Sequence, residues 1–503
     1  MTGTARTAGQ RSRVAESHEA ETAWSWDAAE IERFGAEVAR VIAGYLDDLP
    51  GRPVHRGVPW QERNAWAMEE APRTGTPPAA ILDRFTAEIA PYPFGNGHPR
   101  FYGWVNSPPA VIGVFAEALA AAMNPSVAGG DHAAAHLERQ VVGWFADLAG
   151  LPPGSGGLLV SGASMATLTA LAVARNRAVS AAGLDVRSSG LQAEQAPRAV
   201  IYATVEAHGC VRKAVELLGI GSANIREIEV DHDFAMRPAD LAAALAVDRA
   251  RGYLPVAVVA SAGTVNTGAL DPLIAISDVC AESAVWLHVD AAYGGPAVLL
   301  IDDYREALDG LGRADSIAID PHKWLYVPVD AGLVLLREPR HARDAFSLVP
   351  PYLRIPDGEA PWFSEYGFEQ TRPFRALKIW MAMQHIGLDG YRELISHDLD
   401  LAGYLRDQIA LAPDLELLAG ELSVACFRYL PPGRPRDTSA LDDLNRRLVR
   451  AVQVAGRVFL AGTTVRGAAA LRACVVNPRA RHGDIDVLLS DVREHGARLA
   501  SAR

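Results

Sequence analysis

Apolar positions recur every three or four residues from Trp26 to about Pro91, which is the spacing of one face of an amphipathic helix. The repeat runs through Ile31, Phe34, Val38, Val41, Ile42 and Leu46. Residues 1–23 are polar and rich in Ala, Thr and Ser, a composition that is typical of a flexible tail. We therefore expect a flexible tail over residues 1–23 and a helical N-terminal arm over residues 24–105.

Short apolar runs alternate with helical stretches from residue 106 to about residue 390. The runs that predict buried strands are residues 199–204, 224–230, 256–261, 286–289, 317–319 and 332–337. Helical patterns include residues 131–148, 238–249 and 302–311. This alternation predicts an α/β domain with a mainly parallel central sheet and helices on both faces.

The pattern changes beyond about residue 414. Strand, strand, helix, strand, strand and helix are predicted over residues 415–418, 424–430, 439–454, 458–461, 471–476 and 485–495. This order predicts a small α+β C-terminal domain over residues 391–503. Before it, residues 339–373 are rich in Pro and aromatic residues and predict a long functional loop such as a lid. A helix is expected to follow that loop and to end at Ile386.

Composition narrows the possible partners. Hydrophobic residues make up 49% of the 503 residues, which allows a large core, and the net charge of −12 argues against nucleic acid or anionic membranes as partners. The four cysteines form no CxxC pair, and the N-terminus carries no apolar signal region. No stretch of 18 residues is continuously apolar, so we expect a cytoplasmic protein without a membrane span.

Lys323 is the first candidate for chemistry. The run from Ser316 to Pro328 reads SIAIDPHKWLYVP, and Pro321 stops its apolar strand because proline has no N–H to donate. Lys323 thus follows a strand end, where ligands gather in open α/β sheets and where a lysine can form a Schiff base with a carbonyl. A solvated surface lysine is the alternative interpretation.

Asp290 favours the chemical interpretation. The run from Trp286 to Gly295 reads WLHVDAAYGG, so an acidic residue closes an apolar strand, which is costly without a cationic partner. The protonated pyridine nitrogen of pyridoxal 5′-phosphate (PLP) is such a partner. One βαβ crossover separates Asp290 from Lys323, so the two strand ends are expected to lie side by side.

The motifs HVDAAYGG and DPHKW resemble those of the group II PLP-dependent amino acid decarboxylases, which include aromatic-L-amino-acid, tyrosine, histidine and glutamate decarboxylases. The resemblance covers roughly residues 80–480. It implies the fold-type I architecture of PLP enzymes (aspartate aminotransferase-like), with a large PLP-binding domain at residues 106–390. It also implies a homodimer whose active sites form at the subunit interface.

The resemblance further implies roles for single residues. Lys323 would hold PLP, Asp290 would pair with its ring nitrogen, and His208 would stack on the ring. Contacts to the phosphate are implied for Ala163, Ser164 and His322, and further cofactor contacts for Thr264 and Ala292. Where the family usually has threonine, this chain has Val265.

The substrate is expected to meet the loop at residues 92–109. The implied substrate-binding residues are His98, Tyr102, Trp104, Val105, Asn106 and Arg372. Val105 and Asn106 depart from the more aromatic positions of animal and plant aromatic decarboxylases, which leaves the substrate open. In the family, a tyrosine at the position of Tyr352 protonates the carbanion, so Tyr352 is predicted to be catalytic.

These residues predict decarboxylation of an L-amino acid, either aromatic or an amino-acid-derived biosynthetic intermediate, to an amine and CO2. The alternatives are decarboxylation with oxidative deamination by O2 to an aldehyde, transamination, and a silent scaffold. Tyr352 favours plain decarboxylation, because aldehyde synthases often replace this residue. His132 and His136 share a helix face, but the HExxH glutamate and a third ligand are missing, so no metal is expected.

Overall fold

The computed structural model describes residues 24–192, 196–348, 362–433 and 438–501. Its larger sheet consists of β2 (Gly156–Val160), β3 (Ala199–Thr204), β4 (Ile225–Ile228), β5 (Leu254–Ser261), β6 (Trp286–Asp290), β7 (Ser316–Ile319) and β8 (Gly332–Leu336). The strand order is β2-β8-β7-β6-β5-β3-β4. Only β8 is antiparallel to its neighbours, so the sheet is mainly parallel, as predicted.

Both faces of this sheet are covered. Every residue of β3, β6, β7 and β8 is buried, as expected for strands that lie between two layers of helices. The covering helices are α6 (Ala133–Leu148), α7 (Ala163–Ala181), α8 (Val186–Ser189), α9 (Gly209–Leu217), α10 (Pro238–Ala250), α11 (Leu273–Glu282), α12 (Gly295–Leu300), α13 (Arg305–Leu311) and α14 (Arg340–Phe346). The continuous apolar runs of the sequence follow from this two-sided burial.

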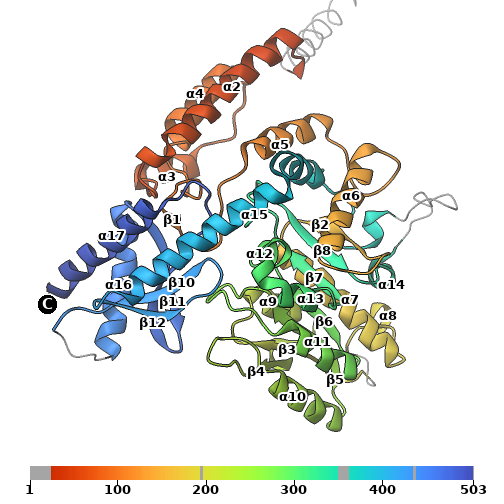
Figure 1. Ribbon diagram of the computed structural model, residues 1–503. Coiled ribbons are helices and arrows are strands. Elements are labelled where there is room, and N and C mark those ends of the chain that lie inside the picture. The colour runs from red at the N-terminus through yellow and green to blue at the C-terminus, as the bar shows by residue number, and fades with distance from the viewer. Residues whose placement is uncertain (1–23, 193–195, 349–361, 434–437, 502–503) are drawn as a thin grey trace, which may run out of the picture.

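A second, smaller sheet lies beside the first (Figure 1). It consists of β1 (Phe101–Tyr102), β9 (Leu415–Ala419), β10 (Val424–Tyr429), β11 (Phe459–Val465) and β12 (Ala468–Cys474). The order is β1-β11-β12-β10-β9, and α16 (Thr438–Ala455) and α17 (His482–Ser501) accompany it. Phe101 pairs with Phe459, so the segment before residue 106 adds a strand to the C-terminal domain. The domain boundaries themselves stay a prediction.

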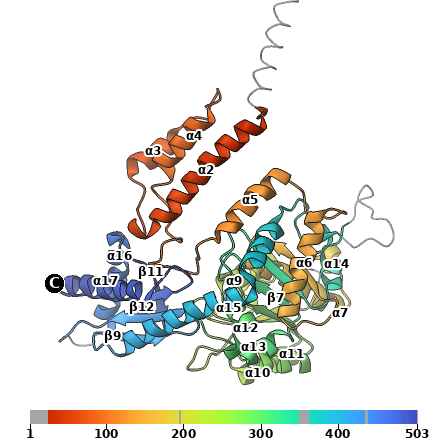
Figure 2. The same ribbon diagram turned by 45° about the horizontal axis from the view of Figure 1, so that its top comes forward.

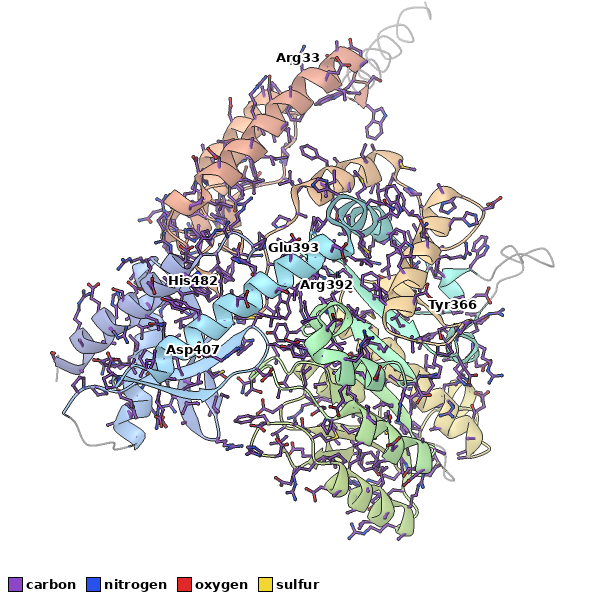
Figure 3. All side chains as sticks on the ribbon, in the orientation of Figure 1. Arg33, Tyr366, Arg392, Glu393, Asp407 and His482 are labelled. Carbon is purple, nitrogen blue, oxygen red and sulfur yellow. The ribbon has the colours of Figure 1, made fainter. Side chains whose placement is uncertain are left out.

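The helical segment α15 (Arg375–Ala410) joins the two sheets. Gly387 breaks it with a φ of 71° and a ψ of 165°, so its first helix ends at Ile386, as the sequence predicted, and a second helix follows the kink. Arg392 donates to the carbonyl of Leu300 in the large domain over 3.0 Å. Near the other end, the rings of Tyr404 and His482 meet edge to face at 4.6 Å (Figure 3). The helix is therefore packed against both domains.

The N-terminal arm projects from the body of the molecule (Figures 1 and 2). It contains α2 (Ala28–Asp48), α3 (Trp60–Met68), α4 (Pro78–Arg84) and a π-helical turn, η2 (Phe85–Ile89). Asp27 and Glu30 form a capping box that starts α2. None of the residues of α2, α3 or α4 is fully buried, and most of the apolar face predicted from the sequence on α2 is half-buried, so this chain covers that face only in part.

The segment at residues 339–373 is more regular than predicted. It contains α14 and a 3-10 turn, η6 (Phe363–Glu365), and the side chain of Glu365 accepts from Arg343 over 2.9 Å. This ion pair closes α14 against the turn, a long-range contact that composition does not reveal. Among the described residues, no helix is long and apolar enough to cross a membrane.

Candidate active site

The carboxyl ends of β5, β6 and β7 lie next to each other at one edge of the large sheet (Figure 1). Ser261 ends β5, Asp290 ends β6, and Lys323 follows β7. One cavity at this edge is lined by Ala163, Ser164, His208, Ser261, Gly263, Thr264, Val265, Asp290, Ala292, Tyr293, Asp320 and Lys323. Every predicted cofactor-binding residue except His322 is among them.

Lys323 is held by a carboxylate inside this cavity. Its Nζ lies 2.8 Å from Oδ2 of Asp320, a residue that is 2% exposed. Burial alone would lower the pKa of the Lys323 amine, but the charge and the hydrogen bond of Asp320, with a smaller effect of Asp290, raise it above its usual value. Lys323 is therefore protonated at neutral pH and is oriented by Asp320.

Asp290 and His208 face the same cavity. Burial raises the pKa of Asp290, and the nearby Lys323 and the backbone N–H of Ala292 oppose that rise. The N–H of Ala292 donates to Oδ1 of Asp290 over 3.1 Å, which fixes the carboxylate at the end of β6. Burial lowers the pKa of His208, so its ring is neutral at pH 7, and its Nδ1 accepts from the N–H of Cys210 over 3.2 Å. A buried acid, a flat neutral ring and an amine thus meet in one place.

Helix α7 begins at the opposite wall. The N–H of Ala163 donates to Oδ1 of Asp320 over 2.6 Å, so one of the predicted phosphate donors is bound by a carboxylate in this structure. Gly332 packs so closely here that a Cβ on it would lie 2.3 Å from the Cα of Gly162. His322, outside the cavity lining, accepts the N–H of Ala331 at its Nδ1 over 3.0 Å.

Thr264 and Val265 form the turn after β5. The hydroxyl of Thr264 lies 2.8 Å from that of Thr267 and accepts the N–H of Ala269 over 3.1 Å. These bonds lie within the turn, and Val265 has no hydroxyl to offer the cofactor; the contact of Thr264 with the cofactor stays a prediction. The pairing of Thr264 with Thr267 could not be predicted from the family spacing.

The predicted substrate-binding residues are spread over several environments. Trp104 is 45% exposed, with a φ of 49°, and Asn106 is half-buried. His98, Tyr102 and Val105 are buried, and Tyr102 lies in the core of the small domain. Within the described part of the chain, none of the five lines the cavity of Lys323. Their contact with substrate stays a prediction.

Arg372, the sixth predicted substrate-binding residue, is 1% exposed and forms an ion pair with the buried Glu138. Its Nη1 donates to the carbonyl of Val127 over 2.8 Å, and its guanidinium lies 4.9 Å above the ring of Phe363. In this chain the side chain of Arg372 therefore fastens α6 to the segment before α15. Tyr352, the predicted proton donor, lies outside the described residues.

Sequence reasoning missed two residues that hold Lys323. Asp320 belongs to the quoted DPHKW motif, but its position three residues before the lysine gave no sign of a 2.8 Å ion pair. Ser107 donates its hydroxyl to the carbonyl of Lys323 over 2.5 Å, across 216 residues of sequence. A serine in a loop carries no local signal of such a contact.

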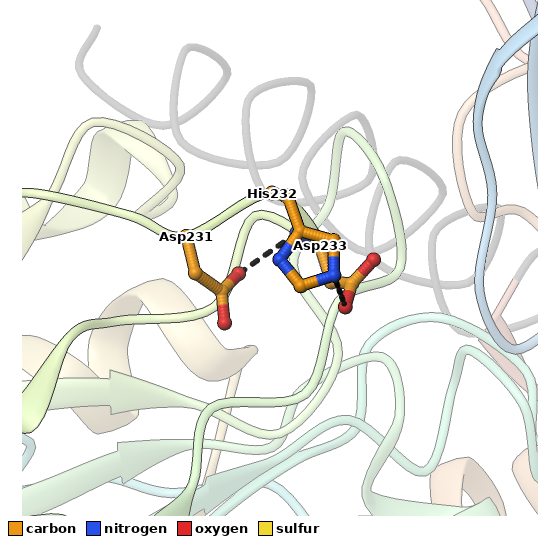
Figure 4. A group of neighbouring side chains, drawn as sticks. All are labelled: Asp231, His232 and Asp233. Carbon is orange, nitrogen blue, oxygen red and sulfur yellow. Dashed lines mark hydrogen bonds and ion pairs between the residues drawn. The ribbon is translucent and has the colours of Figure 1, made fainter.

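Two groups of side chains have residue types that can bind a metal, but both already form hydrogen bonds within the protein. His136 binds Asp131 over 2.8 Å and His132 binds the carbonyl of Gly129 over 3.0 Å, so these two histidines serve the start of α6. Among the described residues, Asp231, His232 and Asp233 are the group with metal-ligand spacing (Figure 4). However, Oδ1 of Asp231 already accepts the N–H of Asp233 over 2.8 Å, and none of the three lines the cavity.

PLP fits the cavity. Its aldehyde requires an amine, which Lys323 would supply, and its pyridine nitrogen requires an acid, which Asp290 would supply, because both residues line this cavity. Its phosphate suits the N-terminus of a 19-residue helix, α7, where Ser164 lines the cavity and the helix dipole favours an anion. The fold and this cavity define a fold-type I PLP-dependent enzyme.

Comparison with known families specifies the enzyme further. The family model described as pyridoxal-dependent decarboxylase conserved domain matches residues 62–430. The chain therefore belongs to the pyridoxal-dependent decarboxylase family, and it is a PLP-dependent amino acid carboxy-lyase.

Its relatives differ in the substrate or product after which each is named. An aromatic-L-amino-acid decarboxylase of Bacillus atrophaeus is 31% identical over 459 residues, covering 90% of this chain and 92% of the relative. An L-2,4-diaminobutyrate decarboxylase of Rhizobium meliloti is 33% identical over 433 residues (85% and 84%). A phenylacetaldehyde synthase of Petunia hybrida is 27% identical over 497 residues (95% and 96%).

A solved structure agrees with the fold over almost its whole length. The crystal structure of Oryza sativa TDC with PLP and tryptamine superposes with a TM-score of 0.87 at 26% sequence identity. The match covers 94% of this chain and 99% of that one. The predicted fold class, cofactor and reaction type are thereby confirmed.

Proposed function

We propose that this enzyme decarboxylates an L-amino acid, aromatic or derived from an amino acid in biosynthesis, with Lys323 as the residue that binds PLP. One observation carries the assignment of Lys323. The chain has three lysines: Lys213 is exposed on α9, Lys378 is bound to Glu117, and Lys323 lines the cavity that also contains Asp290.

The chemistry follows from the groups in this cavity. PLP, when bound, supplies an electron sink for the electron pair that remains when CO2 leaves. Asp290 would hold a proton at the ring nitrogen of the cofactor, since a buried carboxylate favours a cationic partner. His208, which lines the same cavity and is neutral, would exclude water from the cofactor without adding charge.

Proton transfers fall to the groups around the lysine. Lys323 must give up a proton before its Nζ attacks a carbonyl, and Asp320, which lies 2.8 Å from Nζ, opposes that loss because it stabilises the protonated amine. Tyr352, or a water beside it, is proposed to return a proton to Cα after CO2 has left. The presence of Tyr352 favours amine formation over oxidation to an aldehyde.

The aldehyde synthase function is the second candidate, because the Petunia hybrida relative aligns over 95% of this chain. Paired measurements of CO2 release and O2 uptake over a panel of L-amino acids separate the two. CO2 without O2 uptake, together with an amine product, is the expected result. O2 consumed in step with CO2 would overturn the decarboxylase assignment in favour of the oxidative one.

We also propose a homodimer in the cytoplasm. The row Val111, Phe115, Leu119 and Met123 on α5 (Val111–Met123) is 42–59% exposed at helical spacing, which supports a covered face in an assembly. The four cysteines are free and buried, which supports a reducing compartment. Sedimentation velocity should give a dimer, and Phe115→Asp should shift it to a monomer. A wild-type monomer would contradict the proposal.

A further inference from the structure

The turn at residues 322–327, which carries Lys323, is bonded to distant parts of the chain. Besides the Ser107 bond to the carbonyl of Lys323, the hydroxyl of Tyr391 donates to the carbonyl of Leu325 over 3.1 Å. The N–H of Ala110 donates to the carbonyl of Tyr326 over 2.7 Å. Three carbonyls of this turn therefore accept hydrogen bonds from two other segments, one before α5 and one on α15.

The same turn sends two side chains to one buried carboxylate. Asp398 of α15 is 0% exposed, and its Oδ2 accepts from Nε1 of Trp324 over 2.9 Å and from the hydroxyl of Tyr326 over 2.7 Å. Its Oδ1 accepts the N–H of Asn477 over 3.2 Å. Both oxygens of Asp398 are thus used, and two of the three donors belong to the residues that follow Lys323.

Burying the carboxylate of Asp398 costs free energy, so the hydrogen bonds that it accepts are needed to stabilise it there. Burial raises the pKa of Asp398 to about 7, and the bonds from Tyr326, Trp324 and Asn477 oppose the rise. No cation contributes to that balance among the described residues. Three neutral donors hold the group, so losing any one of them leaves a buried acceptor less satisfied.

Asp398 also lies between the cofactor cavity and the segment at residues 92–106 in a chain of contacts. The ring of Trp324 stacks on that of Tyr293, 5.3 Å away with an angle of 13°, and Tyr293 lines the cofactor cavity. On the other side, the amide of Asn477 donates to the carbonyl of His98 over 2.9 Å. Asp398 therefore connects the lysine turn, through Asn477, to the segment at residues 92–106.

We propose that Asp398 is a positioning residue that holds Lys323 in register with the cofactor and couples the lysine turn to the small domain. The inference rests on the proposed role of Lys323. Asp398 touches neither substrate nor cofactor and acts through Trp324 and Tyr326. A displaced turn moves Nζ away from its reaction geometry, where a shift of about 1 Å can lower a rate substantially.

Hydrogen exchange of the full-length holoenzyme tests, without reference to activity, whether Asp398 holds the turn at residues 322–327. In Asp398→Asn, the NH2 group of the new side chain faces the donors Trp324 and Tyr326, so one hydrogen bond is lost. The backbone N–H groups of residues 322–327 should then exchange about tenfold faster, which is the factor for one lost buried hydrogen bond. Asp248→Asn is the control for loss of a buried carboxylate, because Asp248 is also buried and accepts the hydroxyl of Tyr202 over 2.9 Å, but in the β3–α10 layer, where Arg226 binds it as well.

Steady-state kinetics separates positioning from general stability. Asp398→Asn should lower kcat about tenfold with KM nearly unchanged, and should weaken the circular dichroism of the bound cofactor. Asp248→Asn should lower the melting temperature and leave both readouts unchanged. The proposal is wrong if Asp398→Asn lowers the melting temperature while exchange at residues 322–327, kcat and the dichroism stay as in the wild type.

Tyr326→Phe keeps the test decisive if Asp398→Asn does not fold. It removes one donor and leaves the carboxylate, so about a threefold change in the same direction is expected. No change in Tyr326→Phe would overturn the proposal in that case. Borohydride reduction and peptide mapping separate this from the proposed function: label on Lys213 or Lys378 refutes the role of Lys323, whereas label on Lys323 with unchanged exchange refutes the role of Asp398.

Discussion

The cofactor cavity and the segment at residues 92–106 are built in opposite ways. The cavity lies at the ends of β5, β6 and β7, three adjacent strands that are also consecutive in the chain. The segment at residues 92–106 instead joins the small sheet, where Trp104 accepts a hydrogen bond from Arg472, 368 residues later. The order of the strands along the chain is enough to bring the cavity residues together. The segment at residues 92–106 instead depends on contacts with residues near the other end of the chain.

This difference predicts how each region fails. Most cavity residues lie at or just beyond the ends of strands, outside the cores of the sheets, so their replacement should remove activity and leave the fold. The segment at residues 92–106 is part of a shared core, so its replacement should destabilise the domain before it alters chemistry.

Lys323→Ala should reduce decarboxylation by about a thousandfold or more, because no other lysine lines the cavity in the described part of the chain. The absorption band of the lysine-bound cofactor should disappear, while the free energy of unfolding changes little. Lys213→Ala, on the exposed face of α9, is the control and should keep both. A retained band in Lys323→Ala would remove Lys323 from the mechanism.

Phe459→Ala should lower the free energy of unfolding by about 3–5 kcal/mol, the usual cost of truncating a buried phenylalanine. The ring of Phe459 stacks on Phe101 at 5.1 Å and contacts Trp104 at 5.5 Å, which joins β11 to β1. Urea unfolding measures the loss, with the 81% exposed Phe368 replaced by alanine as control. Equal losses of unfolding free energy in the two variants would show that the contact between β11 and β1 is not part of a hydrophobic core.

His98 should make this region acid-sensitive. Burial lowers its pKa to about 4, and Nδ1 already accepts the N–H of Arg100 over 3.0 Å, so an added proton would meet a donor. The unfolded chain binds this proton below about pH 6.5 and the folded chain does not, so stability falls as the pH falls. From pH 7 to pH 5 the loss is about 2 kcal/mol.

Urea unfolding of wild type and His98→Gln at the two pH values isolates this contribution. The variant should lose about 2 kcal/mol less than the wild type over that interval, whereas His482→Gln, at an exposed position, should behave like the wild type. If His98→Gln and the wild type lose the same amount, the titration of His98 does not govern acid stability.

Asp320→Asn should give the smallest effect of these variants. Like Lys323→Ala, it should alter the chemistry of the cavity and leave the fold. Removing the charge lowers the pKa of Lys323, because the carboxylate at 2.8 Å no longer stabilises the protonated amine. Capture of PLP by the apoprotein at pH 7 should then be faster, by roughly tenfold or less. Stopped-flow absorbance measures the rate, and a slower capture in the variant would show that Asp320 mainly orients the amine.

Much of the cavity could be predicted from the sequence. An apolar run that ends in Asp290, and another followed by Pro321 and Lys323, indicate strand ends on any parallel sheet. Parallel pairing of β6 and β7 then follows from a single crossover, and the structure contains it. The bond partners of Lys323 could not be predicted, because Ser107 and Asp398 reach its turn only through packing.

Burial period and strand-stopping residues are local properties, so the sequence alone specifies the class of sheet, the strand ends and the residue types that suit PLP. The fold was needed to reveal that Asp320 pairs with Lys323, that Arg372 pairs with Glu138 inside the core, and that β1 joins the C-terminal sheet. The last two are contacts between distant segments, and the energy of all three depends on which groups packing excludes from water.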